Sequence, residues 1–490
     1  MKELRFTFIA PFGGSGLGAR GFLDAERTLP GLGVRAHWEC LGGVDIDPLA
    51  CADFEHLTGA KQLCADVAAL TPEDARRAWG AKAPDCVFTS APCQGSSALI
   101  SASKAATPKY ATMNELALVW TRLMLATWDE PPALMLFENV PGVPTRAPEM
   151  LRELTRLLRR AGYVLTHSTH DAGELGGLAQ HRRRWLLVAR LPRRCPPVLY
   201  QPPLRRVRGC GEVLEQLPVP GTTAAEAWGP MHALPRASWR NWLRLAAIPA
   251  GGDWRDLDGV LGAGQPRREV FRRHRVEQWD GATGTITADA GSNGVGAVAD
   301  PRATSWFGGV LGVLPWDAPA GVVTASAAPT RGAFSVADLR VTSAFDAGYS
   351  VLRWDQAART IATKTAPGSG AYAVADARAE RPEPRVYSVP TDLDEVPNPA
   401  PVILARDGTW HRPLTTLELA ALQGFPLRVD GAPLRLAGGI THQRRSIGNA
   451  VPAPAARAIG EQMLLALTEA ALGGFSLSPE PVWVNPEANA

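Results

Sequence analysis

Short apolar runs alternate with amphipathic stretches over the first 190 residues. Runs of strand length occur in "RFTFIAPF", "CLGGVDID", "DCVFTSA", "ALMLFENV", "YVLTHSTH" and "RWLLVAR". Segments of helical periodicity lie between them, such as "PEMLRELTRLLRRAG", whose apolar positions recur at i, i+3, i+4 and i+7 before a glycine. This alternation of strands and helices predicts an α/β fold with a parallel, doubly wound sheet.

The pattern changes at about residue 190 and again at about residue 405. "LPRRCPPVLYQPPLRRVRGCG" is rich in proline and arginine, and the following stretch is rich in glycine, threonine, proline and tryptophan with little helical periodicity. Helical sequence then returns in "LTTLELAALQGFP", a Thr-capped segment, and in "SIGNAVPAPAARAIGEQMLLALTEAAL". We therefore expect one domain formed by residues 1–190 and 406–475, an insertion at 191–405, and a tail at 476–490.

The insertion contains an internal repeat with a period of 37 to 38 residues. Each copy begins near a Trp-Asp pair and ends near a Val-Ala-Asp triplet, and the copies cover 278–302, 315–340 and 353–378. A period held three times predicts stacked, equivalent β-rich units. The repeats either build a scaffold with the tryptophans as core, or align their polar loops in a row that follows a regular polymer.

Composition and charge narrow the class of protein. The chain has 490 residues, 46% of them apolar and 20% charged, which is typical of a globular protein. No apolar run approaches the ~18 residues of a membrane span, and glycines break the first apolar run too early for a signal peptide. We therefore expect a cytoplasmic protein without membrane association.

Cysteine and arginine are distributed unevenly. The seven cysteines are odd in number and form no CxxC pair, so we expect mostly buried thiols, no disulfide framework and no metal site. Net charge is only +3, yet Leu175 to Gly211 contains nine arginines and no acid. That stretch is either a solvated surface or a phosphate-binding face.

A glycine-rich turn and two aspartates end successive predicted strands. "FIAPFGGSGLGARGF" reads as strand, turn and helix, Asp45 follows in "GVDIDP", and Asp66 follows in "LCADVAAL". Asp45 could bind two ribose hydroxyls and Asp66 an adenine amino group, which together predict a cradle for a nucleoside cofactor. The alternative is that the turn only packs strand on helix and that each aspartate is a helix N-cap.

Cys93 in "SAPCQGSSA" follows the fourth predicted strand, and Glu138 and Asn139 end the fifth. A thiol and a carboxyl group on neighbouring strand ends can form an activated nucleophile pair; an inert buried thiol is the alternative. With an adenosyl-type cofactor, this pair suits methylation of an unactivated aromatic carbon such as cytosine C5. The thiolate would add to C6 while the acid acts at N3.

Seven motifs occur in one order: "FGGSGLG", "GVDIDP", "APCQGSS", "ENV", "QHRRR", "LTTLELAALQGFP" and "GNAVP". In these motifs the sequence resembles the DNA (cytosine-5)-methyltransferase family, over residues 1–190 and 410–475. "APCQ" stands against the family's Pro-Pro-Cys-Gln, and "QHRRR" against Gln-x-Arg-x-Arg. The resemblance implies a Rossmann-like methyltransferase domain, S-adenosyl-L-methionine as cofactor and double-stranded DNA as partner. It also implies that the target cytosine is flipped out of the duplex and that 191–405 is the target-recognition domain.

The resemblance also implies roles for individual residues. Cys93 would be the nucleophile, Glu138 would contact N3, and Arg182 and Arg184 would steady the base and the catalytic loop. The cofactor would bind Phe12, Gly13, Gly14, Gly16, Asp45, Ile46, Asp66, Val67, Pro92, Asn449 and Val451. We expect DNA to contact Gln94, Ser96, Ser97, Gln180, Arg183, Thr285, Thr324 and Thr360, the three threonines lying in the polar loops of the repeats.

Two departures and several alternatives accompany this interpretation. Ala10 stands where the family usually has an acid and Leu17 where it has a second glycine, so weaker cofactor binding is expected.

We expect a monomeric DNA (cytosine-5-)-methyltransferase, either solitary or with a cognate restriction endonuclease. An RNA cytosine-5 methyltransferase and a catalytically weak DNA-binding relative are alternatives. An NAD(P)-dependent oxidoreductase would use the glycine turn but would leave Cys93 and Glu138 without a role.

Overall fold

The computed structural model describes residues 1–92, 108–196, 199–236 and 410–474, together with shorter pieces within 238–404 and the strand at 482–484. The chain divides into two compact units. The first consists mainly of Met1–Arg208 and Gln423–Ala490, and the second of Gly209–Thr283 and Thr287–Leu422. Within the described residues, no helix combines the length and the apolarity needed to span a bilayer.

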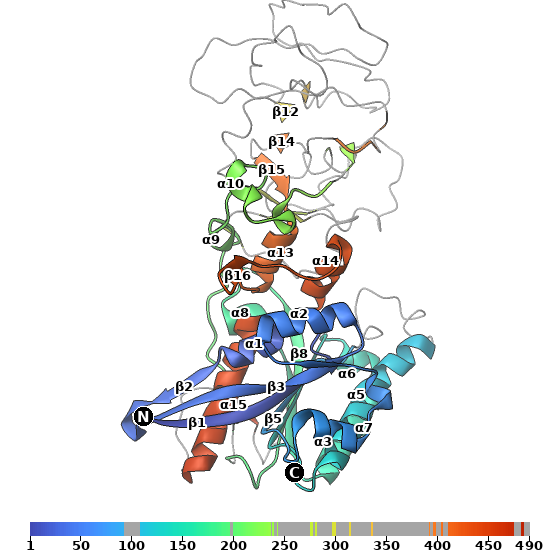
Figure 1. Cartoon of the computed structure of the whole chain (residues 1–490), viewed down its shortest axis with the longest axis vertical. Coiled ribbons are helices and arrows are strands. Elements are labelled where there is room, and N and C mark those ends of the chain that lie inside the picture. The colour runs from blue at the N-terminus through green and yellow to red at the C-terminus, as the bar shows by residue number, and fades with distance from the viewer. Residues whose placement is uncertain are drawn as a thin grey trace, which may run out of the picture. The chain divides into compact units, whose positions relative to one another are not determined.

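The first unit is built on a sheet of eight strands in the order β2-β3-β1-β5-β6-β8-β7, with β4 paired to β3. Figure 1 labels β1, β2, β3, β5 and β8 of this sheet. The strands are β1 (Lys2–Pro11), β2 (Glu26–Leu29), β3 (Val34–Asp45), β4 (Gln62–Cys64), β5 (Cys86–Thr89), β6 (Leu134–Asn139), β7 (Val164–Asp171) and β8 (Arg183–Arg190). The six apolar runs named above all form strands, and the predicted α/β class with a Rossmann-like methyltransferase sheet is confirmed.

The expectation that the whole sheet is parallel is wrong for two strands. β1, β3, β4, β5 and β6 are parallel, whereas β8 is antiparallel to both β6 and β7, and β2 is antiparallel to β3. The reason lies in the connections. Between β7 and β8 the only helix is α8 (Ala172–Gly176), and between β2 and β3 there is a single 3-10 turn (Pro30–Leu32). Connections this short join antiparallel neighbours, because a parallel pair needs a longer crossover.

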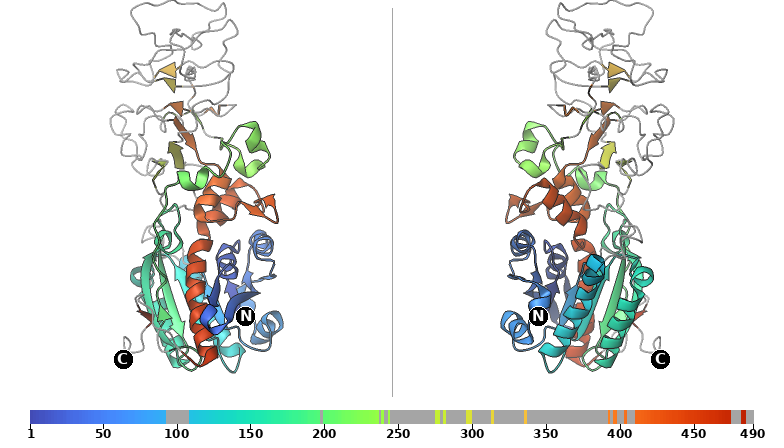
Figure 2. Two further views of the ribbon diagram at one scale, coloured as in Figure 1. Left: turned by 90° about the vertical axis from the view of Figure 1, so that its left-hand side faces the viewer. Right: turned by 90° about the vertical axis from the view of Figure 1, so that its right-hand side faces the viewer.

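Alternate residues of the strands supply two hydrophobic cores, one on each face of the sheet. Phe8 belongs to the core that includes Phe22 and Met463, whereas its neighbour Ile9 belongs to the core that includes Trp120. This follows from the period of two along a strand. The helices on the first face are α1 (Leu17–Leu23), α8 and α15 (Ala453–Leu472); those on the second are α3 (Pro72–Trp79), α5 (Pro108–Thr127) and α7 (Pro148–Arg160). Figure 2 shows α15 and α5 on opposite sides.

The C-terminal segment completes the first unit, as the sequence predicts. Trp38 Nε1 donates a hydrogen bond to the carbonyl oxygen of Gly460 at 3.2 Å. A Cβ at Gly21 would lie 2.2 Å from the Ala453 carbonyl oxygen, so α1 and α15 approach too closely for a larger residue there. Smaller elements of this unit are α2 (Pro48–Thr58), α6 (Val143–Arg146), α14 (Ile440–Asn449), the pair β16 (Arg428–Val429) and β17 (Ala432–Pro433), and the pair β9 (Leu199–Tyr200) and β18 (Val482–Val484).

The second unit has short elements in its described part. Its helices are α9 (Gly211–Leu214), α10 (Thr223–Glu226) and α13 (Thr416–Gln423), and the last residue of α13 belongs to the first unit. A four-stranded sheet has the order β10 (Arg275–Glu277), β11 (Gly296–Ala299), β15 (Trp410–Pro413) and β14 (Ile403–Leu404). A separate pair consists of β12 (Val313–Leu314) and β13 (Ser335–Val336). Thr415 Oγ1 accepts a hydrogen bond from the Glu418 amide at 3.2 Å, so the predicted threonine cap of α13 is confirmed.

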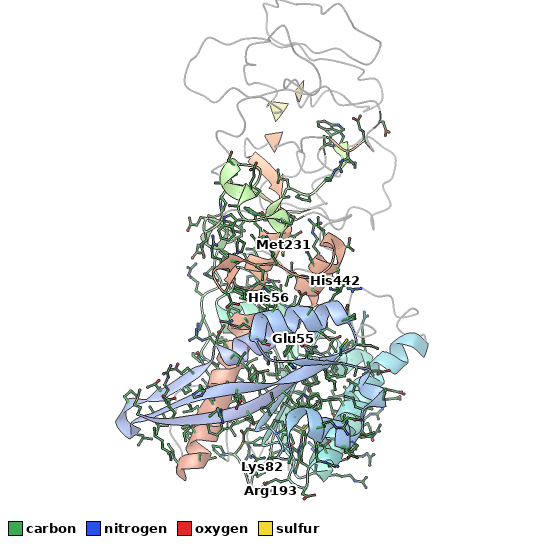
Figure 3. The ribbon with its side chains drawn as sticks, in the orientation of Figure 1. Glu55, His56, Lys82, Arg193, Met231 and His442 are labelled. Atoms are coloured by element: carbon green, nitrogen blue, oxygen red, sulfur yellow. The ribbon has the colours of Figure 1, made fainter. Side chains whose placement is uncertain are left out.

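Most of the repeat region lies outside the described residues. β11 falls in the first repeat and β13 in the second, and the whole of 353–378 lies outside the described part of the chain. The stacking of the three repeats therefore stays a prediction, as does the domain division at 190 and 405. Figure 3 shows the described side chains of both units.

Candidate active site

The turn between β1 and α1 has an unusual backbone. Phe12, Gly14 and Gly16 have φ angles of 53°, 53° and 84°, in the left-handed region that favours glycine. A Cβ at Gly13 would lie 2.8 Å from the Ala10 carbonyl oxygen, and one at Gly16 would lie 2.9 Å from Phe54 Cα in α2. At Gly14, by contrast, no atom of the described residues other than its chain neighbours lies within 4 Å of the added Cβ. Gly13 and Gly16 therefore let the turn pack closely, while Gly14 borders open space.

Asp45 joins this turn to the end of β3. Its Oδ2 accepts a hydrogen bond from the Gly14 amide at 3.0 Å, and its Oδ1 accepts one from the Asp47 amide at 3.1 Å. The next residue, Ile46, is an apolar side chain with 69% of its surface exposed. An open space over Gly14, a fixed carboxylate and an uncovered apolar side chain fit the ribose and the flat base of a nucleoside.

Asp66 lies at the end of the next strand, β4, and has a structural role. Its Oδ1 accepts a hydrogen bond from the Ala68 amide at 2.9 Å and caps the 3-10 turn Val67–Ala69. Asp66 is exposed, whereas Val67 is buried. The N-cap interpretation is thus confirmed for Asp66, and within the described part of the chain Oδ2 of its exposed carboxylate has no hydrogen-bond partner.

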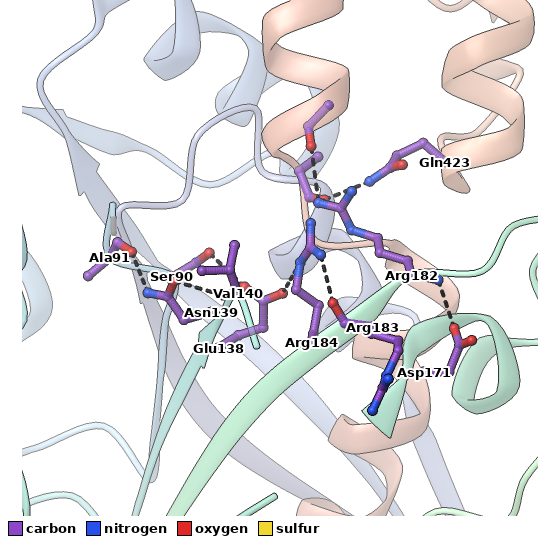
Figure 4. Close-up of polar contacts among 12 residues, drawn as sticks. Ser90, Ala91, Glu138, Asn139, Val140, Asp171, Arg182, Arg183, Arg184 and Gln423 are labelled. Carbon is purple, nitrogen blue, oxygen red and sulfur yellow. Dashed lines mark hydrogen bonds and ion pairs between the residues drawn. The ribbon is translucent and has the colours of Figure 1, made fainter. Parts of the chain in front are cut away.

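Glu138 is held near the C-terminal end of β6 by two neighbours (Figure 4). Its Oε2 accepts a hydrogen bond from Ser90 Oγ at 3.3 Å, and its Oε1 lies 3.2 Å from Arg184 Nε, an ion pair whose angle is not that of a hydrogen bond. Only 10% of the Glu138 side chain and 15% of the Arg184 side chain are exposed. Burial lowers the pKa of Arg184, and the nearby Glu138 carboxylate opposes that shift.

The segment that leads to Cys93 is anchored at two points. The Asn139 side-chain amide donates a hydrogen bond to the Ala91 carbonyl oxygen at 2.9 Å (Figure 4). The Ser90 amide donates to the Pro11 carbonyl oxygen at 3.4 Å. Pro92 is half-buried and follows directly. Cys93 itself lies outside the described residues, together with Gln94, Ser96 and Ser97.

Arg182 connects the start of β8 to the "GNAVP" segment. Its side chain is almost fully buried, and Nη2 donates hydrogen bonds to the carbonyl oxygens of Gly448 at 3.1 Å and Ala450 at 3.0 Å. Burial, and then the neighbouring Arg184, lower the pKa of Arg182 to about 9, so the guanidinium stays charged at neutral pH. A charged donor shared by two carbonyl groups makes strong hydrogen bonds.

Gln180 and Gln423 extend this connection. Gln180 Nε2 donates to Gln423 Oε1 at 2.9 Å, and Gln423 Nε2 donates to the Ala450 carbonyl oxygen at 2.8 Å. Gln180, predicted to contact DNA, is fully buried in this conformation, whereas Arg183 is exposed. The other predicted DNA contacts, Thr285, Thr324 and Thr360, lie outside the described residues.

Asp171 is a site residue that the sequence did not reveal. Its Oδ1 accepts hydrogen bonds from the amides of Gly173 and Arg182, each at 2.8 Å, and its Oδ2 lies 2.7 Å from His181 Nδ1. Burial by itself raises the pKa of Asp171, but these hydrogen bonds outweigh it and the pKa lies below its ordinary value. Asp171 therefore fixes the backbone of the "QHRRR" segment. An aspartate after an apolar run is too common to identify this from sequence.

The two C-terminal residues expected at the cofactor lie in different settings. Asn449 is exposed at the end of α14, and Val451 is buried against α1, where a Cβ at Gly18 would be 3.2 Å from Val451 Cβ. α14 also contacts Asp47, the N-cap residue of α2. Arg445 Nη2 lies 3.1 Å from Asp47 Oδ2, and His442 Nδ1 lies 3.8 Å from the same oxygen (His442 is labelled in Figure 3). The "GNAVP" segment thus returns to the glycine-rich turn.

The sequence matches a known protein family over more than half of its length. A family model described as C-5 cytosine-specific DNA methylase matches residues 7–197 and 353–465. The chain belongs to this family. Its members are methyltransferases, and in general they use S-adenosylmethionine. No curated relative matches the chain in sequence.

Two solved structures show the same fold. The methyltransferase EhMeth of Entamoeba histolytica has a TM-score of 0.50 at 11% identity, covering 94% of this chain and 98% of its own. A protein described as a DNA modification methyltransferase encoded within an E. coli prophage has a TM-score of 0.51 at 14% identity, covering 95% and 100%. At such identities the likeness concerns the fold alone.

Within the C-5 cytosine-specific methylase fold, the two departures noted from sequence are packing positions. Ala10 is 2% exposed on β1 and Leu17 is 1% exposed on α1. Ala10 is a member of the hydrophobic core on the first face of the sheet. The acid and the glycine usual in the family are thus replaced by apolar side chains that are buried in the described structure.

Proposed function

We propose that this protein transfers the methyl group of S-adenosylmethionine to C5 of a cytosine flipped out of double-stranded DNA. The observation that carries the proposal is the position of Glu138. Its carboxyl group is fixed by Ser90 and Arg184, beside the anchored segment that leads to Cys93. Asp45, which we propose binds the cofactor, lies at the same edge of the sheet, because β3, β1, β5 and β6 are parallel and successive neighbours.

The chemistry divides among three side chains. Cytosine C5 is a poor nucleophile, and a bond from the Cys93 thiolate to C6 raises the electron density at C5. A hydrogen bond from the Glu138 carboxyl to N3 stabilises the charge that develops on the ring. Arg184 holds Glu138 in place. Once C5 carries the methyl group, loss of the C5 proton lets the Cys93 sulfur leave and restores the aromatic ring.

The cofactor supplies a methyl group bonded to a positively charged sulfur. The residues proposed to hold it are the turn at Phe12–Gly16, the carboxylates of Asp45 and Asp66, and the apolar side chain of Ile46. Asn449, Val451, Val67 and Pro92 complete the proposed set. The hydrogen bond from the Gly14 amide to Asp45 keeps the turn and the carboxylate in register before any ligand arrives.

DNA is preferred over RNA as substrate for two reasons. The arginine-rich run from Arg182 to Arg208 suits a phosphate backbone. The long insertion with its repeats offers more surface than a compact RNA-directed enzyme needs. An RNA cytosine-5 methyltransferase is the second candidate, because the family chemistry at the base is the same.

Transfer of labelled methyl groups tests the proposal. Purified protein is incubated with tritiated S-adenosylmethionine and either duplex DNA or RNA of the same sequence. We expect label in DNA, no label with Cys93→Ser, and cytosine methylation at one sequence context by bisulfite sequencing. Label in RNA alone would establish the second candidate, and label in neither would contradict both.

A further inference from the structure

Two thiols lie beside the proposed cofactor site and have no role in the mechanism above. Cys51 is in the first turn of α2, and Cys64 is the last residue of β4, where it pairs in register with Asp45 of β3. Cys51 Sγ lies 3.6 Å from the Asp45 carbonyl oxygen, and Cys64 Sγ lies 4.0 Å from the Ile46 carbonyl oxygen. The two sulfurs therefore contact consecutive carbonyl groups of one turn.

The positions of the two thiols also allow them to react with each other, and allow one of them to react with a reagent in solution. The Cys51 and Cys64 sulfurs contact the carbonyl groups of two adjacent residues, Asp45 and Ile46, so both thiols lie beside the same short stretch of backbone. Among the six cysteines in the described part of the chain, Cys64 alone is exposed, while Cys51 is buried. An exposed thiol next to a buried one can be attacked from solution and then resolved internally.

We propose that Cys51 and Cys64 are a modification site, which forms a reversible disulfide by exchange with small-molecule disulfides and thereby weakens cofactor binding at Asp45 and Ile46. The second part rests on the proposed function; the first does not. In the first step the Cys64 thiolate attacks a disulfide such as oxidised glutathione, giving a mixed disulfide and one released thiol. In the second step Cys51 attacks Cys64 Sγ, and the other thiol leaves. The protein loses two hydrogens and two electrons, and one glutathione disulfide becomes two thiols.

The environment of Cys51 sets the order of these steps. Burial, and then the neighbouring Cys64, raise the pKa of the Cys51 thiol to about 12. Because the thiolate is the nucleophile, Cys51 reacts slowly at neutral pH, and Cys64 is the group that meets the oxidant. Closure of the ring is therefore expected to speed up as pH rises from 7 to 9.

Oxidation acts on the cofactor site through the same two carbonyl groups. Both S–H donors are lost when the disulfide forms, so the Asp45 and Ile46 carbonyl groups lose their thiol contacts. The sulfurs must also approach to about 2.05 Å, which draws β4 and α2 together. The two residues whose carbonyl groups contact the sulfurs carry the Asp45 carboxylate and the exposed Ile46 side chain, so we expect both side chains to shift.

Mass spectrometry tests the modification directly. The protein is incubated with oxidised glutathione, free thiols are alkylated, and the digest is searched for linked peptides. We expect a Cys51–Cys64 link in the wild type and in Cys40→Ser, a control thiol that contacts the Gly42 carbonyl oxygen, and none in Cys64→Ser. Glutathione retained on Cys64 with no internal link would overturn the disulfide.

Calorimetric binding of S-adenosylhomocysteine tests the consequence. We expect oxidation to weaken binding about tenfold or more in the wild type and in Cys40→Ser, with recovery in dithiothreitol. Cys64→Ser still contains Cys93, so if oxidant leaves its affinity unchanged, the effect in the wild type comes from the Cys51–Cys64 pair and not from Cys93. Equal affinities of the wild type before and after the disulfide forms would overturn the proposal that the disulfide weakens cofactor binding. Absence of binding even in the reduced, folded protein would reject the proposed function, while the linked peptide still decides the modification.

Discussion

Arg184 Nε lies 3.2 Å from Glu138 Oε1, and this contact exists because β8 is antiparallel to β6. The antiparallel pairing brings the start of β8 to the end of β6, where Asn139 is opposite Trp185. A parallel β8 would place Arg184 at the other edge of the sheet. The ion pair is nearly buried, so the attraction between its charges is only weakly screened.

Removing Arg184 should reduce the rate of methyl transfer. Arg184→Ala leaves Glu138 without its cation, and we expect kcat to fall about a hundredfold while S-adenosylhomocysteine binding is unchanged. Arg184→Lys keeps the charge but not the planar group, and an intermediate rate is expected. Single-turnover kinetics on duplex DNA measure this. Wild-type turnover in Arg184→Ala would show that the ion pair has no catalytic role.

Arg182 should matter chiefly for stability and for the cofactor. Arg182→Met removes the donor shared by the Gly448 and Ala450 carbonyl groups, and we expect the free energy of unfolding to fall by about 2–4 kcal/mol. Cofactor binding should weaken as well, since Asn449 and Val451 flank Ala450. Urea unfolding and calorimetry measure the two effects.

Arg183→Ala is the matched control for Arg182→Met, because Arg183 directly follows Arg182 at the start of β8 and its side chain is exposed. We expect a change in stability within about 0.5 kcal/mol. Should both variants lose equal stability, the buried hydrogen bonds of Arg182 would not be the cause.

Two glycines of the β1–α1 turn should respond differently to alanine. Gly14→Ala adds a methyl group in open space at a φ of 53°, so we expect a stability loss of about 1–2 kcal/mol and a weaker affinity for S-adenosylhomocysteine. Gly16→Ala adds the same strain plus a 2.9 Å contact with Phe54 Cα, so a larger loss of stability is expected. Thermal unfolding with and without ligand separates the effects. Unchanged affinity in a folded Gly14→Ala protein would place the cofactor elsewhere.

Because of Asp53, we expect the free energy of unfolding to be larger at mildly acidic pH than at neutral pH. Its Oδ1 accepts a hydrogen bond from the Ala437 amide at 2.6 Å, whereas Oδ2 has no partner among the described residues. Burial raises the pKa of Asp53 to about 6. Because this folded-state pKa lies above the unfolded value, the folded protein binds the extra proton, and the stabilisation is lost as pH rises through 6.

Asp53→Asn should remove that dependence. A shift of two pKa units sets a ceiling of about 3 kcal/mol, and partial access of water reduces the expected gain to about 1–2 kcal/mol at pH 7.5, vanishing near pH 4. Urea unfolding across this range measures it, with the exposed Asp129→Asn as control. A gain that is the same at pH 4 and pH 7.5 would exclude titration of Asp53 as its origin.

Local pattern was a good guide to the elements of the first unit. Each apolar run read as a strand forms one, "PEMLRELTRLLRRAG" forms α7 with Leu154 and Leu158 buried, and the C-terminal helix returns to α1. These features depend on the period of side chains along a strand or helix, which is written in neighbouring residues. The direction of β8 cannot be read from neighbouring residues in this way. It depends on the connection from β7, which is short although it contains the helix α8.

The sequence by itself determined the types of side chain available for chemistry: a thiol at Cys93, a carboxyl group at Glu138 and the arginines of "QHRRR". Only the tertiary structure decided their partners. Arg182 bonds to carbonyl groups 266 and 268 residues away, and Arg184 meets a glutamate on a strand of opposite direction. Hydrophobic periodicity acts over a few residues and fixes which face is buried. The pairing of distant polar groups depends on strand order and direction, which emerge only when the whole sheet packs.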